Sequence, residues 1–294
     1  MAPLPLVVGV DGSGPGLLAV DWAVDEAARH HLPLRLVHAS LWAAYDGAVP
    51  PPGGPPSARA TAEHVVATAA GRARRRDPRI EVSTAVLPED AARALLRAGD
   101  SAAFLVVGSR GRGTVKGLLL GSVGLAVAAR ARCPVIVVRG DPAGLAGTHE
   151  RILLGAGDPG TSGEAARFAF REAEARGCAL DVVRAWRCPA YETLDHPAPA
   201  GEPERRHKER ASALLDAALR EPIAAHPGVR VRRATVEGPA SKVLVLRSAA
   251  ADLVVVGARR HRGHAGLQLG RASHTLLHHA ECPVAVVPEV SRPA

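Results

Sequence analysis

The sequence predicts an α/β protein built from two similar tandem domains, each with a parallel sheet covered by helices on both faces. First, short apolar runs alternate with longer stretches of helical periodicity along all 294 residues, which is the pattern of parallel strands joined by helical crossovers. Second, 47% of the residues are hydrophobic but only 3% are aromatic, as in helix-covered sheets built from Val, Leu and Ala. Third, the chain contains an internal repeat, which divides its length into two domains of ordinary size.

The first half contains five short apolar runs that we expect to be strands. These runs cover residues 6–11, 34–39, 80–87, 103–107 and 134–138. Helical periodicity predicts helices over 16–31, 58–75 and 89–98, and a further helix that begins at Ser122. The segment 41–57 is rich in proline and glycine, which predicts a long surface loop.

The second half repeats these elements. The apolar run that starts at Arg151 matches the first strand, residues 180–185 match the second, and residues 252–257 match the fourth. The sequence Cys-Pro-Val opens the last strand of each half, and we interpret its cysteine as a buried small hydrophobic residue and not as part of a disulfide framework. The repeat predicts a domain over residues 1–140 and another over 150–294, with a linker over 141–149.

Composition argues against several classes of function. No apolar run approaches the ~18 residues of a membrane span. The N-terminus has no signal-peptide pattern, so we expect a soluble, cytoplasmic protein. The net charge of +8 comes mostly from scattered arginines without stacking aromatics, which does not suit nucleic acid. The cluster Arg72 to Arg76 is interpreted as a solvated run that ends a helix. His274 and His278 have zinc-like spacing, but nothing completes a ligand set, so no metal site is predicted.

The stretch from Gly108 to Val123 carries the clearest functional signal. An apolar strand stops at Gly108, a glycine-rich basic loop follows, and Gly121-Ser122 opens a helix. Backbone N–H groups can converge on a phosphate in this arrangement, and glycine at 108 and at 111 lets a ligand approach the main chain. Ser122 would add a hydroxyl and a favourable helix cap. The structural alternative is an ordinary strand-to-helix turn that binds nothing, and the loop lacks the Gly-Lys-Ser/Thr of a Walker motif.

Asp11 is expected to lie opposite this loop. It ends the first strand, in the sequence Asp11-Gly12-Ser13. Ligands of parallel α/β sheets bind at the carboxyl ends of the strands, where the strand order reverses. Asp11 and Gly108 are therefore predicted to be neighbours across one crevice, and together they predict a nucleotide phosphate site.

These residues resemble the universal stress protein family in its tandem two-domain form. The spacing Gly108-x2-Gly111-x9-Gly121-Ser122 fits the ATP-binding pattern of that family, and Val-Gly-Val-Asp-Gly-Ser at 8–13 and Val-His-Ala at 37–39 support the match. The resemblance covers nearly the whole chain. It implies a five-stranded parallel sheet of order 3-2-1-4-5 in each domain, Rossmann-like and of the adenine nucleotide alpha hydrolase type.

The resemblance also implies an ATP site, with or without magnesium, in the N-terminal domain. Asp11 would contact the ribose or metal region, and the backbone of Ala39 would meet the adenine. Arg110, Arg112 and Lys116 would be extra phosphate partners, unless they form only a solvent-exposed basic loop. The residues implied around the phosphates are Gly108, Gly111, Gly121, Ser122 and Val123.

The C-terminal domain is predicted to bind ATP poorly or not at all. Gly157 stands at the position of Asp11, so the carboxylate is missing. Arg260 replaces Gly111 and places a long side chain where the backbone should approach phosphate. Arg271 replaces Ser122, which removes the hydroxyl and the expected cap.

No catalytic residue is predicted. ATP hydrolysis needs an oriented water and a base or arginine finger, and no Glu, Gln or His lies beside the glycine loop. The leading hypothesis is an ATP-binding stress-response protein whose nucleotide state alters its binding to an unidentified regulatory protein partner. The alternatives are a slow ATPase or phosphotransferase, and a scaffold of two packed domains. The resemblance implies an intramolecular pseudo-dimer of the two halves, with a homodimer of two chains as a further alternative.

Overall fold

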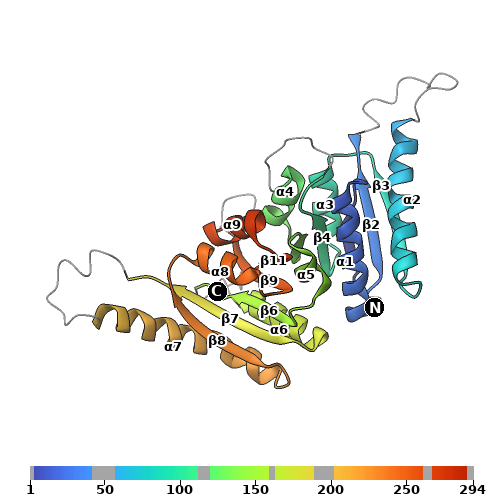
Figure 1. Cartoon of the computed structure of the whole chain (residues 1–294). Helices are drawn as coiled ribbons and strands as arrows, with labels where there is room; N and C mark the ends of the chain where they lie inside the picture. Colours follow the sequence, from blue (N-terminus) through green and yellow to red (C-terminus); the bar gives the residue numbers. More distant parts are fainter. Residues whose placement is uncertain are drawn as a thin grey trace. The chain divides into compact units, whose positions relative to one another are not determined.

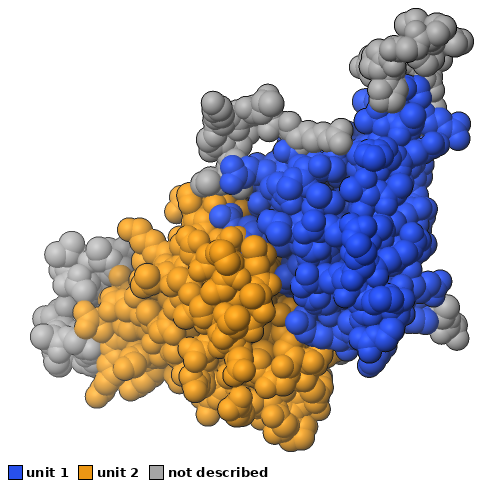
Figure 2. Space-filling model, turned by 45° about the vertical axis from the view of Figure 1, so that its right-hand side comes forward, with its two compact units in different colours: residues 1–139, 265–267 blue, residues 140–264, 268–294 orange. Residues whose placement is uncertain are grey.

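The fold is seen in a computed structural model of the chain (Figure 1), which describes residues 3–41, 57–111, 120–158, 163–188, 202–260 and 267–289. Two compact units make up the chain, and Figure 2 colours them separately. Unit 1 comprises residues 1–139 and 265–267, and unit 2 comprises residues 140–264 and 268–294. Most of the loop predicted over 41–57 lies outside the described residues.

Unit 1 contains one parallel sheet with helices on both of its faces, so the predicted α/β architecture is confirmed. Leu6 of the first strand pairs with Leu34 on one side and with Phe104 on the other. The strands, in the spatial order β3-β2-β1-β4-β5, are β3 (Val82–Leu87), β2 (Leu34–Ala39), β1 (Leu6–Gly9), β4 (Phe104–Gly108) and β5 (Val135–Val138). The helices are α1 (Gly14–His30), α2 (Ala58–Arg76), α3 (Ala91–Gly99) and α4 (Ser122–Arg130).

Burial explains why the central strands are uninterrupted apolar runs. Val7 and Val8 are adjacent in β1, so they point to opposite faces of the sheet, yet both are fully buried. A sheet covered on both faces has this pattern. The edge strand β3 differs, because Ser83 and Thr84 are exposed, and the strand starts at Val82 and not at Ile80, whose N–H bonds back to Asp77 in a turn.

Unit 2 has the same arrangement, so the predicted tandem repeat is confirmed. Its strands, in the spatial order β8-β7-β6-β9-β11, are β8 (Val231–Glu237), β7 (Ala179–Trp186), β6 (Arg151–Gly155), β9 (Leu253–Arg260) and β11 (Val284–Pro288). The short strand β10 (Leu267–Gln268) lies off this order, and only its second residue belongs to unit 2. The helices are α5 (Pro142–Ala146), α6 (Gly163–Arg176), α7 (Glu202–Ala225), α8 (Ala240–Ser248) and α9 (Arg271–His279). The segment expected to be a linker contains α5, which Asp141 caps by accepting from the Gly144 N–H at 2.8 Å.

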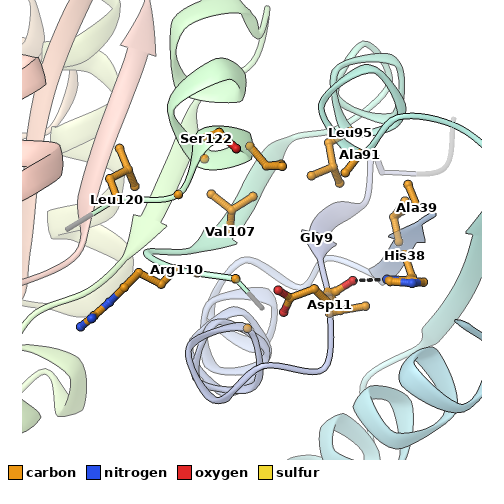
Figure 3. A pocket seen from close by; sticks show the side chains of 18 residues that line it. Gly9, Asp11, His38, Ala39, Ala91, Leu95, Val107, Arg110, Leu120 and Ser122 are labelled. Atoms are coloured by element: carbon orange, nitrogen blue, oxygen red, sulfur yellow. Dashed lines mark hydrogen bonds between the residues drawn. The ribbon is translucent and has the colours of Figure 1, made fainter. Parts of the chain in front are cut away.

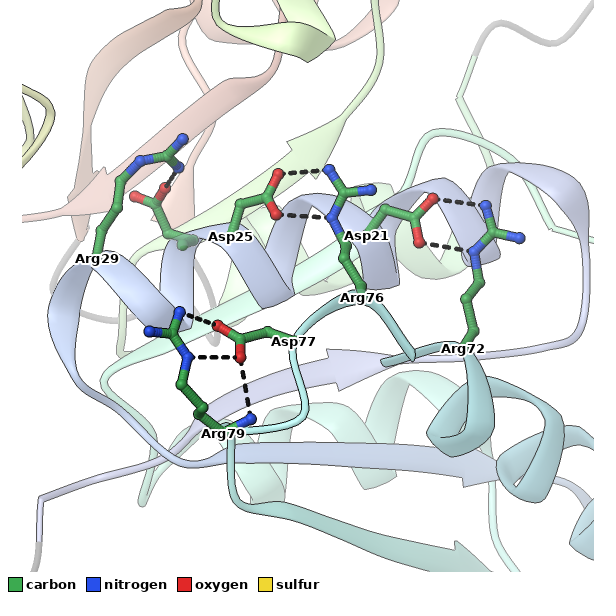
Figure 4. Close-up of polar contacts among 8 residues, drawn as sticks. Asp21, Asp25, Arg29, Arg72, Arg76, Asp77 and Arg79 are labelled. Carbon is green, nitrogen blue, oxygen red and sulfur yellow. Dashed lines mark hydrogen bonds and ion pairs between the residues drawn. The ribbon is translucent and has the colours of Figure 1, made fainter. Parts of the chain in front are cut away.

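The arginine cluster at the end of α2 is paired with α1 (Figure 4). Arg72 donates Nε and Nη2 to Asp21 at 2.7 and 2.5 Å, and Arg76 donates to Asp25 at 2.6 and 2.7 Å. These hydrogen bonds are the main reason why the pKa of each guanidinium group is raised. The interpretation of the whole cluster as a solvated run is therefore wrong for these two arginines and holds only for the exposed pair between them.

Two further expectations concern the cysteines and membrane segments. Cys133 and Cys282 are buried, with 7% and 0% of their surface exposed, as predicted from the Cys-Pro-Val runs. Burial raises the pKa of the Cys133 thiol to about 11. In the part of the chain that the structure describes, none of the helices combines the length and the apolar character needed to cross a bilayer.

Candidate functional site

A cavity of about 330 Å³ opens at the carboxyl-terminal edge of the sheet in unit 1 (Figure 3). The ends of β1, β2 and β4 and the first turns of α3 and α4 form its walls. Small-molecule sites occupy about 300–1,000 Å³ and occur at this edge of α/β sheets. All seven residues that the sequence predicted to contact ATP line this cavity, namely Asp11, Ala39, Gly108, Gly111, Gly121, Ser122 and Val123.

Asp11 is held in place by the turn that starts α1. Gly12 has a φ of 78°, a left-handed conformation that favours glycine, so the chain turns sharply after Asp11. The Ser13 side chain caps α1 by accepting from the Gly16 N–H at 3.1 Å. The same hydroxyl donates to Asp11 Oδ1 at 2.6 Å, and the Ser13 N–H donates to that oxygen at 3.0 Å. The Asp-Gly-Ser sequence thus fixes the orientation of the carboxylate.

Two of the predicted glycines allow close contacts within the protein itself. A Cβ atom on Gly111 would lie 2.6 Å from Asp11 Oδ2, and one on Gly108 would lie 2.6 Å from the Pro15 carbonyl oxygen. Both separations are well below ordinary van der Waals contact. Glycine at these positions therefore lets the loop approach the Asp11 carboxylate and lets α1 approach β4.

The glycine loop is tied to the sheet at both of its described ends. The Ser109 N–H donates to the Val138 carbonyl at 3.0 Å, and the Gly121 N–H donates to the Ser109 carbonyl at 2.9 Å. Arg110 lines the cavity and is exposed, and its side chain points away from Asp11 and Ser122 (Figure 3). Arg112 and Lys116, the other two basic residues expected near phosphate, lie outside the described residues.

Ser122 lies at the start of α4 but does not cap it. Gly121 is the N-cap residue and has no side chain to donate or accept, whereas Ser122 is the first helical residue and is exposed. The predicted cap is therefore wrong, because the helix begins one position too early for it. The first-turn amides of any α-helix lack intrahelical partners, and here Ser122, Val123 and Gly124 line the cavity. This end of the helix can therefore offer N–H donors and a partial positive charge to an anion.

The side of the cavity opposite Ser122 is largely apolar apart from Asp11 and His38, and of its residues only Asp11 and Ala39 were predicted. Figure 3 shows His38 and Asp11 on one side and Ser122 on the other. The His38 Nδ1 lies 2.7 Å from the Val10 carbonyl oxygen, so in the neutral ring Nδ1 carries the proton. The Val-His-Ala motif contains this histidine, but the sequence does not reveal that its ring lines the cavity. The apolar lining residues include Val37, Ala91, Leu95 and Val107.

Unit 2 contains a corresponding cavity of about 390 Å³. Gly155 takes the place of Gly9, because a Cβ atom on either would lie 2.8 Å from a leucine Cδ1, that of Leu244 or of Leu95. Gly157 lines this cavity at the position of Asp11, as predicted. The next residue is an aspartate that also lines the cavity, so unit 2 does have a carboxylate nearby.

Arg260 and Arg271 were expected to prevent ATP binding in this cavity, but neither is among the described residues that line it. Arg271 is exposed and is the first residue of α9, whose Ala272 and Ser273 line the cavity. The Arg271 substitution removes no helix cap, because a glycine is the N-cap of both α4 and α9. Arg260 is the last residue of β9, and its side chain lies outside the described part of the structure.

Arg184 distinguishes this cavity from that of unit 1. It stands at the position of His38, near the end of β7, and its side chain is only 12% exposed. Its guanidinium group donates to the Gly157 carbonyl and to Asp158 Oδ1, the latter at 2.8 Å. Sequence reasoning missed this pair, because only the folded sheet brings the ends of β6 and β7 together.

The start of α6 in unit 2 is occupied by a side chain of the protein. Glu289, which follows β11, accepts a hydrogen bond from the Glu164 N–H at 3.1 Å. Burial raises the pKa of Glu289, and the hydrogen bonds from the helix amides oppose that rise. The N-terminus of α6 therefore already has an acceptor, whereas among the described residues no side chain caps the N-terminus of α9.

Comparison with known proteins identifies the family. Residues 5–139 and 148–288 each match the sequence profile of the Universal stress protein family. A universal stress protein of Mycolicibacterium smegmatis is 32% identical over 295 residues, and one of Mycobacterium tuberculosis is 32% identical over 293 residues, with 96% of both chains covered in each case. The crystal structure of a universal stress protein from Archaeoglobus fulgidus has the same fold, with a TM-score of 0.67, 16% identity and coverage of 97% of this chain and 98% of that one. The chain belongs to the universal stress protein family and carries one family domain in each half.

Proposed function

We propose that the N-terminal domain binds ATP and that the protein acts in stress-response regulation as a nucleotide-dependent binding module. The observation that carries this proposal is the cavity of unit 1, which is lined by the glycine loop, the start of α4 and a carboxylate that the protein holds in place. A triphosphate needs N–H donors and a positive helix end, and the base needs apolar walls beside polar main-chain groups.

In this proposal the ligand lies along the carboxyl-terminal edge of the sheet. The adenine lies beside the backbone of Ala39, between the apolar side chains of that wall, and the phosphates lie at the first turn of α4. Asp11 faces the ribose hydroxyls or a magnesium ion between these two ends. Magnesium at nucleotide sites is usually held by one or two carboxylates together with phosphate oxygens, and Asp11 fits that role. When bound, the ion would neutralise charge on the phosphates.

A binding role is favoured over catalysis by the residues at the phosphate end. Among the described lining residues, no Glu or Gln lies near the start of α4, and His38 lies on the base side with Nδ1 directed at the Val10 carbonyl. The alternative of a slow ATPase or phosphotransferase rests on Asp11 alone. Single-turnover hydrolysis with and without Mg²⁺, compared with Asp11→Ala, separates the two functions, because a binding module releases no more phosphate than the variant.

Calorimetric titration of the full chain with ATP and Mg²⁺ tests the proposal. We expect one ATP per chain, and none for Gly111→Glu, whose side chain would fill the cavity beside Asp11 and repel the phosphates. Adenine nucleotide released from freshly purified protein on denaturation would support the same conclusion. A chain that neither carries nor binds adenine nucleotide would leave only the scaffold of two domains, and two ATP per chain would refute the asymmetry between the halves.

A further inference from the structure

We propose that the cavity of unit 2 is a second ligand site, which takes a small organic oxyanion with an apolar body and holds the anionic group at Arg184. This inference concerns a different cavity from the proposed ATP site and does not depend on it. The cavity is large enough for a small molecule, at about 390 Å³. The ligand class follows from the side chains that line it.

Arg184 supplies the recognition element. Its side chain is largely buried at the cavity wall, with 12% exposed, and its described partners are the Gly157 carbonyl and one oxygen of Asp158. A guanidinium group presents five N–H donors in a planar fork that matches the two oxygens of a carboxylate or phosphate. A partly desolvated arginine in a cavity wall therefore favours an oxyanion as the ligand.

Asp158 occupies the position that the anion would take. Its side chain is 69% exposed, in contrast with that of its partner Arg184. Asp158 is already largely in contact with water, so moving it into solvent carries a smaller desolvation change than moving a buried carboxylate would. The buried guanidinium group needs a negative partner, and an incoming anion can supply it. A ligand anion can thus replace Asp158 on the same guanidinium group and leave the charge of the cavity balanced.

The other walls suit the rest of such a molecule. Val183, Leu244 and Val256 line the cavity with apolar side chains. The start of α9 adds polar character, since Ser273 is a lining residue with 4% exposure and the first turn of this helix contains no acidic residue. A Cβ atom on the N-cap Gly270 would meet no described atom within 4 Å. Among the described residues, none therefore blocks the α9 end of the cavity at this position.

Ligand-observed NMR titration of the full chain can test this site with three probes that share one ring. Benzoate represents carboxylates, phenyl phosphate represents phosphate monoesters, and benzyl alcohol is the uncharged control. We expect at least one anion to bind and benzyl alcohol to bind far more weakly. The anion that binds more tightly shows whether the site prefers a carboxylate or a phosphate monoester, and either preference supports the site.

Three variants show whether Arg184 is responsible. Arg184→Gln should raise the Kd of the anion by about tenfold or more, the worth of a charge-assisted hydrogen bond. Asp158→Asn should lower the Kd, because it removes the competing carboxylate and leaves the arginine in place. Arg233→Gln is the matched control, since this exposed arginine also pairs with one aspartate, at 2.7 Å from Asp216 Oδ1, and its loss should leave the Kd unchanged.

The two cavity variants change affinity in opposite directions, so a loss of folding cannot imitate the expected result. Asp158→Asn keeps the test decisive even if Arg184→Gln fails to fold. The proposal is overturned if Asp158→Asn does not tighten binding, if Arg233→Gln weakens it as much as Arg184→Gln, or if benzyl alcohol binds as tightly as the anions.

Discussion

Gly111→Ala tests the link between the glycine loop and Asp11. The new methyl carbon would lie 2.6 Å from Asp11 Oδ2, whereas ordinary contacts of this kind begin at 3.4 Å. The carboxylate must therefore shift by several tenths of an ångström, which strains its two hydrogen bonds with Ser13. A displaced carboxylate loses part of a charge-assisted hydrogen bond or metal contact worth about 1.5–3 kcal/mol. We expect a loss of about 1–2 kcal/mol, or roughly 5–30-fold in the Kd for ATP.

Calorimetry with ATP and Mg²⁺ on the full chain measures this change, and Gly14→Ala is the matched control. Gly14 directly follows the Asp11-Gly12-Ser13 turn, but a Cβ atom there would meet no described atom within 4 Å. Its substitution should leave ATP affinity unaltered. If Gly111→Ala binds ATP as tightly as the wild type and Gly14→Ala, then the loop and the carboxylate do not act on a common ligand.

Three further predictions concern packing, the helix pair and the buried thiol. Gly108→Ala should destabilise unit 1 by about 1–3 kcal/mol, because its methyl group would meet the backbone of Pro15 at 2.6 Å; thermal unfolding monitored by calorimetry checks this, and an unchanged midpoint would contradict it. Arg72→Gln should lower the free energy of unfolding in urea by at most about 1 kcal/mol, since its ion pair with Asp21 is partly exposed, with 39% and 17% of the two side chains accessible. A loss of several kcal/mol would show that this ion pair contributes more to stability than its exposure suggests. The Cys133 pKa of about 11 exceeds the ~8.5 of an unfolded cysteine, so this thiol should resist alkylation at pH 8. Its contribution to the free energy of unfolding should fall as pH rises from about 8.5 to 11, because only the unfolded thiol ionises over most of that range. Rapid labelling of Cys133 in the native protein, detected by mass spectrometry, would refute the burial argument.

Much of the fold could be predicted because its signals are local. The apolar runs buried on both faces gave strands close to their observed positions, as at 34–39, where prediction and structure agree. Helix ends were less accurate. The helix expected over 89–98 spans Ala91–Gly99, because Asp90 is its N-cap and accepts from the Arg93 N–H at 2.9 Å. Several residue types can cap a helix, so the sequence alone does not determine which one does.

The candidate site could also be predicted only in part. The seven predicted lining residues come together because strand order brings the ends of β1, β2 and β4 to one edge, and glycine and aspartate at strand ends are visible in a sequence. The Arg184 pair with Asp158 could not be predicted, because it depends on the direction of a long side chain across two strands. The pairing of Arg72 with α1 was hidden for the same reason.

The Ser13 hydroxyl takes part in two interactions at once, as acceptor for the first turn of α1 and as donor to the carboxylate in the cavity. A ligand that draws Asp11 towards itself would therefore also disturb the N-terminal cap of α1. Occupancy of the cavity would then be reported at a distance, as a change in how readily the amide of Gly16 exchanges its hydrogen with solvent. The regulatory role proposed above requires a connection between the ligand and the rest of the domain, and the Ser13 oxygen atom would supply it at the start of α1.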